Sequence, residues 1–97
     1  MNSSCSCEVE VVNAQGMHAR PVMKFVDLAS QFESEVMVRN LSRRGEDLDG
    51  KSAMHLMLLD AAQGSRLRIS ARGADAAAAV EALAALVRDG FGMSEGA

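Results

Sequence analysis

The stretch Gly16-Met17-His18-Ala19-Arg20-Pro21 marks the point where an extended segment turns into a helix, and it organises the segments on both sides. Pro21 has a backbone φ suited to the first turn of a helix and lacks the N–H that would have no partner there. We therefore expect a helix to begin between Ala19 and Pro21. Gly16 allows the preceding turn to take a positive φ or to approach other backbone closely.

The flanking segments alternate between strand and helix patterns. Residues 8–11 alternate polar and apolar, as a half-buried strand does. After Pro21, apolar residues recur at three- and four-residue steps as far as Phe32, which predicts a helix with one buried face. Residues 34–41 alternate again, and a turn at 42–45 leads to residues 46–48, so we expect a hairpin.

The second half of the chain predicts two more helices around one strand. Residues 51–59 suggest a short helix with Ser52 near its N-cap, ending near Gln63 and Gly64. Residues 66–72 alternate strictly and place arginines on one face. An alanine-rich helix follows, with Asp75 as its cap and Gly90 as its stop. The order βαββαβα predicts an α+β fold whose helices cover one face of an antiparallel sheet.

Length and composition favour one small soluble domain over residues 1–97, with a flexible extension at 1–6 and a flexible tail at 92–97. Hydrophobic residues make up 48% and charged residues 24% of the chain, with a net charge of −3, which gives no support to nucleic-acid binding. We find no membrane span and no signal peptide, and expect a cytoplasmic location. Cys5 and Cys7 are expected to be reduced thiols.

His18 is the candidate site residue because a helix N-terminus favours an anion beside it. Arg20 adds a forked cation suited to phosphate oxygens, and the small Ala19 leaves the ring open to another protein. Imidazole is also a nucleophile near pH 7 without a partner base. The alternative is a surface or capping histidine without chemistry. No catalytic triad or zinc pattern accompanies it, since His55 is the other histidine, and we expect no metal.

The chain resembles HPr, the histidine-containing phosphocarrier family of the bacterial phosphoenolpyruvate:sugar phosphotransferase system. Residues 16–21 match the active-centre motif of that family except for Met17 in place of leucine, and further matches follow in family order at residues 51–52, 61–64 and 73–76. The resemblance implies an open-faced β-sandwich, with a four-stranded antiparallel sheet covered on one face by three helices. It also implies a phosphoryl carrier without a cofactor, rather than a stand-alone enzyme.

The resemblance to this family implies that His18 takes a phosphoryl group on Nδ1 from enzyme I and passes it to an enzyme II A-type domain. Arg20 would stabilise the phosphate, with Gly16, Ala19 and Pro21 forming the loop around it. Ser52 corresponds to a regulatory position phosphorylated by a serine kinase/phosphorylase, and it also suits an ordinary N-cap. Three residues are expected to contact partners of a monomeric carrier: Met17, Met54 and Met57.

Two departures from the family and two other functions stay open at this point. His55 stands where the family usually has glycine, and residues 40–50 form a segment longer than in the best-known members. The first alternative is a regulatory adapter that acts on kinases or transcription factors without sugar transport. The second is a non-catalytic α+β binding module in which His18 is incidental.

Overall fold

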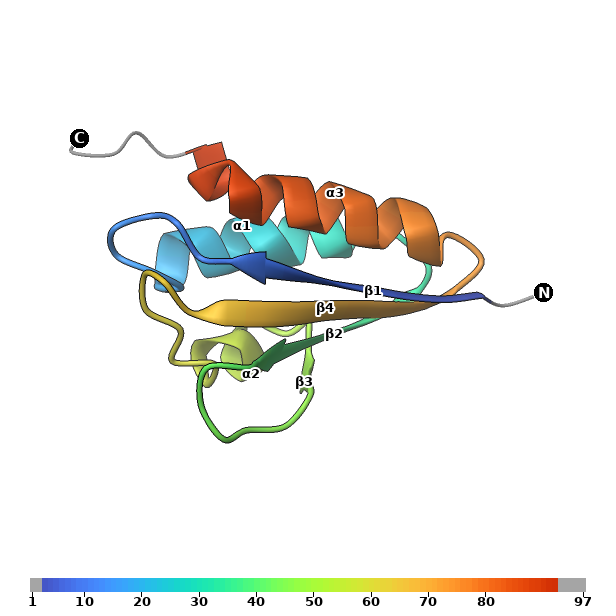
Figure 1. Ribbon diagram of the computed structural model, residues 1–97. Coiled ribbons are helices and arrows are strands. Elements are labelled where there is room, and N and C mark those ends of the chain that lie inside the picture. Colours follow the sequence, from blue (N-terminus) through green and yellow to red (C-terminus); the bar gives the residue numbers. More distant parts are fainter. Residues whose placement is uncertain (1–2, 93–97) are drawn as a thin grey trace.

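A computed structural model describes residues 3–92 (Figure 1). Its elements follow the predicted order, with a short 3₁₀ turn at the end. The strands are β1 (Ser3–Glu10), β2 (Glu35–Asn40), β3 (Leu48–Asp49) and β4 (Arg66–Gly73). The helices are α1 (Ala19–Ala29), α2 (Ala53–Met57), α3 (Ala76–Arg88) and the 3₁₀ turn η1 (Gly90–Gly92).

The strands form one antiparallel sheet in the order β1-β4-β2-β3. β4 is central and pairs with β1 along its whole length, from Ser3 opposite Gly73 to Glu10 opposite Arg66. Its other edge pairs with β2, from Glu35 opposite Arg72 to Asn40 opposite Leu67. α1 and α3 lie along one side of this sheet (Figure 1), and Leu56 of α2 is buried in the same core, so the predicted α+β architecture is confirmed.

The alternation along β4 separates the two faces of the sheet. Leu67, Ile69 and Ala71 are buried under the helices, while the arginines between them lie on the open face, as predicted. Burying one face of each strand supplies the core because apolar area removed from water is the main stabilising contribution to folding. The six largest fully buried side chains come from the helices, η1 and the central strand β4: Phe25, Phe91, Leu56, Leu67, Ile69 and Leu83.

The N-terminal part of the sheet corrects one prediction. We expected residues 1–6 to be a flexible extension and the strand to begin at Glu8, but β1 begins at Ser3. β4 runs on to Gly73 and offers backbone partners to residues 3–6, so hydrogen bonding overrides their weakly patterned composition. Residues 1–2 and 93–97, which include most of the expected tail, lie outside the described part of the chain.

The end of α2 differs from the predicted position, and the end of α3 matches it. α2 ends at Met57, well before the expected Gln63, and Asp60 then takes a φ of +49° that no helix permits. α3 ends where expected, because Gly90 takes a φ of +65°. None of the helices within residues 3–92 is long and apolar enough to cross a lipid bilayer.

Asp75 joins the start of α3 to the loop after α1. It is the N-cap residue of α3, as predicted, yet its carboxylate makes no capping hydrogen bond. It accepts instead from the backbone N–H groups of Glu33 and Ser34, each at 2.9 Å, and from the Ser34 hydroxyl. The Ser34 hydroxyl first, and then the Glu33 N–H, lower the pKa of Asp75 from 3.8 to about 2.

Candidate functional site

His18 is the N-cap residue of α1, with an extended backbone at φ −97° and ψ −170°. Its carbonyl accepts the first helical hydrogen bond from Val22 N–H at 3.0 Å, while its side chain makes no capping bond. The ring is therefore not used to stabilise the helix, which removes the capping role from the alternative interpretation of this histidine.

The loop before His18 is held by backbone contacts with residues that follow α2. Met17 N–H donates to Ala61 O at 2.8 Å, and Gly16 adopts a φ of +68° against the same segment. A Cβ atom on Gly16 would lie 2.4 Å from Ala61 O, so glycine is required here by space as well as by φ. The buried Asn13 amide donates to Gly16 O at 2.8 Å and closes the turn. Sequence analysis missed Asn13.

The His18 side chain is half-buried, and its two ring nitrogens differ. Nε2 has no contact with solvent and no hydrogen-bond partner within the described residues. Native proteins rarely leave a buried polar atom unpaired, and exceptions often mark functional groups. The other ring nitrogen, Nδ1, is not among these buried unpaired atoms.

Arg20 lies exposed in the first turn of α1, where the helix dipole disfavours a cation. The first turn holds no acidic side chain, and Arg20 forms no ion pair with any residue in 3–92. Pro21 is buried against the core and Ala19 is exposed. The helix end therefore presents N–H groups and a guanidinium that an external anion could satisfy.

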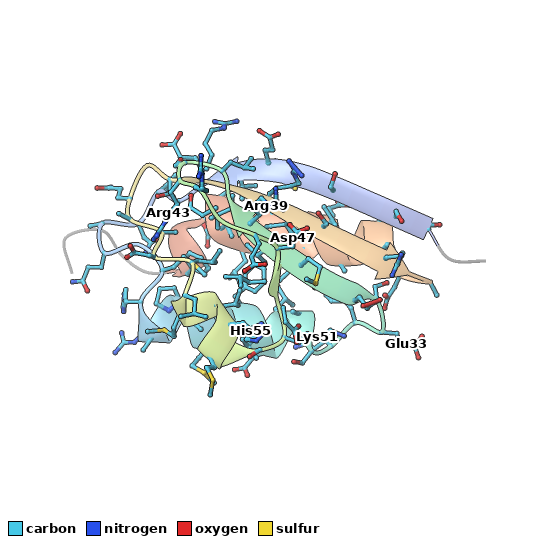
Figure 2. All side chains as sticks on the ribbon, turned by 90° about the horizontal axis from the view of Figure 1, so that it is seen from below. Glu33, Arg39, Arg43, Asp47, Lys51 and His55 are labelled. Carbon is cyan, nitrogen blue, oxygen red and sulfur yellow. The ribbon has the colours of Figure 1, made fainter. Side chains whose placement is uncertain are left out.

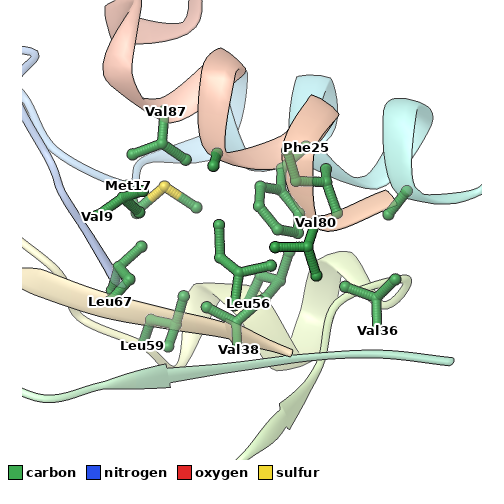
Figure 3. Packing of buried hydrophobic residues seen from close by; sticks show 14 of the residues in the cluster. Val9, Met17, Phe25, Val36, Val38, Leu56, Leu59, Leu67, Val80 and Val87 are labelled. Carbon is green, nitrogen blue, oxygen red and sulfur yellow. The ribbon is translucent and has the colours of Figure 1, made fainter. Parts of the chain in front are cut away.

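Met17 does not lie on the surface, which corrects its predicted role in docking. Only 6% of it is exposed, and Figure 3 shows its sulfur pointing into the cluster that contains Val9 and Val87. The backbone bond from Met17 to Ala61 turns the side chain inward, where an unbranched thioether fills the space between strand and helix. Met17 packs the loop against the core and is not available to a partner.

α2 and its C-cap residue, Leu58, carry the most exposed large hydrophobic side chains within residues 3–92. Met54 is 78% exposed, Leu58 67% and Met57 49%, whereas Leu56 on the opposite side is fully buried. α2 packs against α1, and Ala61 just beyond it contacts the His18 loop. These three side chains, which we call the α2 patch, thus lie on the element next to the candidate site.

Ser52 caps α2 as predicted, its Oγ accepting from His55 N–H at 3.2 Å. Lys51 and His55 flank it on the same side of the molecule (Figure 2). Lys51 Nζ donates to Phe32 O at 2.6 Å, and His55 Nδ1 lies 3.4 Å from Asp49 N. The hydroxyl of Ser52 thus has a structural role as the N-cap of α2.

The longer segment at 40–50 and the cysteines make contacts of their own. Arg39 and Asp47 form an ion pair at 3.2 Å across the base of the segment, and Arg43 pairs with Asp60 at 2.7 Å (Figure 2). Cys5 and Cys7 are half-buried free thiols on the helix-facing side of β1, and burial raises the pKa of Cys7. Within residues 3–92 no three His, Cys, Asp or Glu side chains form a group able to hold a metal ion.

Comparison with known proteins identifies the family. Residues 5–89 match the family described as "PTS HPr component phosphorylation site". The chain belongs to the HPr family. The phosphocarrier protein HPr of Neisseria meningitidis serogroup A is 44% identical over 87 residues, covering 90% of this chain and 94% of that protein. The phosphocarrier protein NPr of Proteus mirabilis is 41% identical over 83 residues, covering 86% and 90%.

Solved HPr structures share the fold. HPr-C-His from Thermoanaerobacter tengcongensis matches with a TM-score of 0.85 at 34% identity, covering 93% of this chain and 98% of that one. The predicted resemblance to HPr and the open-faced fold are therefore confirmed. The general role that goes with the family is phosphoryl carriage in the phosphotransferase system.

Proposed function

We propose that His18 is the phosphoryl acceptor of this HPr-family chain and that it bonds phosphorus through Nδ1. The observation that carries the proposal is the enclosed Nε2 of a half-exposed ring that caps nothing. A partner approaching from solvent meets Nδ1, and the dipole of α1 favours the transferred charge. Arg20 supplies a forked cation to the phosphate oxygens beside Ala19, in the loop that Gly16 and Pro21 shape.

The donor is enzyme I and the acceptor an enzyme II A-type domain, the partners that the family implies. The lone pair on Nδ1 attacks phosphorus of the enzyme I phosphohistidine; the new N–P bond forms as the old one breaks, and the donor imidazole leaves. The second transfer repeats this step toward a histidine or cysteine of the acceptor. The carrier itself uses positioning and charge, which are the main protein contributions to such a transfer.

Incubation with enzyme I, phosphoenolpyruvate and Mg²⁺ tests this assignment by intact mass and acid stability. We expect one acid-labile phosphate on the wild-type chain and on Ser52→Ala, and none on His18→Ala. Phosphate retained on a folded His18→Ala variant, or none on wild type with a demonstrably active donor, would overturn the assignment. The second result would favour the binding-module alternative.

We also infer that Ser52 can take a regulatory phosphate from a serine kinase/phosphorylase. The hydroxyl lies at the first turn of α2, beside the α2 patch, so a phosphate there would add about −1.5 to −2 charges next to the docking surface. Treatment with that kinase and ATP should give an acid-stable phosphate that Ser52→Ala lacks. An unmodified Ser52 beside a phosphorylated control HPr would contradict this inference.

The proteins that accept phosphate from this chain would distinguish a role in sugar uptake from a role as a regulatory adapter. The chain is similar in identity to relatives named HPr and relatives named NPr, so the family alone does not choose between them. We propose sugar uptake as a cytoplasmic monomer, because a carrier must present one face to successive partners. Transfer from phosphorylated chain to sugar-specific enzyme II A-type domains would support this role, and transfer to none of them would favour the adapter.

A further inference from the structure

The methionines within residues 3–92 differ sharply in exposure, with Met37 on the open sheet face half-buried. Met54 is 78% exposed, Met57 49% and Met23 48%, while Met17 is 6% exposed. The three exposed methionines lie on α1 and α2, the two helices that pack together beside His18. Thioethers are apolar and usually fill gaps in cores, so this concentration in water at the candidate site needs a functional account.

Within residues 3–92, the two cysteine thiols are the other sulfur groups that an oxidant can reach. The sequence has no Trp and no Tyr. Cys5 and Cys7 are half-buried against the core, and burial raises the pKa of Cys7, which keeps its thiol protonated and slow to react. Met54, at 78% exposure, is the most accessible sulfur side chain within residues 3–92.

We propose that Met54 and Met57 are sites of reversible oxidation to methionine sulfoxide and that this oxidation weakens docking through the α2 patch. The oxidant is a peroxide or hypohalous acid; with hydrogen peroxide, sulfur gains one oxygen and loses two electrons, and the peroxide becomes water. The product is polar where the thioether was apolar, and sulfoxide reductases reverse it. The effect on docking rests on the proposed function, whereas the oxidation itself does not.

Oxidation of Met54 and Met57 would affect docking because both side chains belong to the α2 patch. Met54 and Met57 are one helical turn apart, so they share a face with each other and present it away from the buried Leu56. A partner that buries this face gains from removing apolar area from water. Two sulfoxide oxygens on the same face would have to be desolvated on docking, which lowers affinity without touching the His18 ring.

Peptide mapping by mass after graded hydrogen peroxide treatment of the folded chain tests the sites. Among these methionines we expect Met54 to react fastest, Met57 and Met23 next, and Met17 slowest, with thiol oxidation scored separately on the peptides that contain Cys5 and Cys7. Reaction of Met17 as fast as Met54 would overturn the proposal. Unfolding in denaturant should abolish the difference between Met17 and Met54.

Phosphoryl transfer from enzyme I tests the consequence. With both sulfoxides formed, we expect kcat/KM to fall about tenfold, the size of a lost interface contact, mainly through KM. Methionine sulfoxide reductases should restore it. The double variant Met54→Leu/Met57→Leu should keep its own untreated rate after peroxide, while Met37→Leu, on the open sheet face, should still lose activity.

An unchanged rate after complete oxidation of both methionines would overturn the docking consequence. If the untreated chain accepts no phosphate from an active enzyme I, the proposed function fails and takes this consequence with it. Peptide mapping then still decides the oxidation sites, so the two failures are distinguishable.

Discussion

The two ends of α1 differ in how completely their polar groups are paired. At its start, His18 leaves Nε2 buried without a partner, and Arg20 is a cation at the end of the helix that disfavours one. Beyond its end, Glu33 and Ser34 give every available donor to the carboxylate of Asp75. The paired end joins two elements of the fold, whereas the unpaired end is left incomplete for an external group. Of the three buried side-chain atoms without a hydrogen-bond partner within residues 3–92, His18 Nε2 and Asn13 Oδ1 belong to this loop, and the third, Arg39 Nε, lies 3.2 Å from the Asp47 carboxylate.

The largest effect should come from His18→Ala, which separates function from stability. We expect complete loss of phosphoryl acceptance from enzyme I, with a free energy of unfolding within about 0.5 kcal/mol of wild type because the ring makes no structural bond. Mass spectrometry and urea unfolding measure the two quantities. A large loss of stability would show that the start of α1 is structural after all.

Arg20→Ala should slow phosphoryl transfer by about 10- to 100-fold, the range expected when one charged hydrogen-bonding group is lost. Its matched control is Arg68→Ala, which removes an arginine from the open face of the sheet and should leave transfer rates unchanged. Rapid-quench kinetics with phosphorylated enzyme I compares the two. Equal rates for both variants would contradict a role for Arg20 beside the phosphate.

Gly16→Ala should destabilise the fold by about 1–3 kcal/mol, because it combines a positive φ with a steric clash against backbone. The control is Gly64→Ala, where φ is +91° but no atom lies within 4 Å of the added Cβ. Thermal unfolding of the pair isolates the clash from the backbone strain. If both variants lose the same stability, the contact with Ala61 contributes nothing.

Asp75→Asn should give the smallest effect and the one that depends on pH. The folded pKa is about 2 against an ordinary 3.8, so the carboxylate contributes stability above pH 4 that is lost as pH falls toward 2. The variant should therefore melt below wild type at pH 7, and the two curves should converge near pH 2. Phosphoryl acceptance at pH 7 should not change. A constant difference in melting temperature across this range would rule out the carboxylate as its cause.

Apolar residues that repeat every two residues, or every three to four, predicted most of the strands and helices. The strict alternation of residues 66–72 and the stripe after Pro21 placed β4 and α1, because each period decides which side chains face a core. Weak patterns failed: residues 3–6 have no strong strand signal, and only pairing with β4 orders them.

The candidate site divides in the same way. The sequence alone indicated a histidine before a helix, a nearby cation and a capping serine, since these depend on neighbours along the chain. Tertiary structure decided that Met17 is buried, that Asn13 closes the turn, and that Asp75 bonds a loop and not its own helix. It also enclosed Nε2 of His18. These outcomes depend on residues far apart in sequence, and local periodicity carries no information about which distant groups fold together.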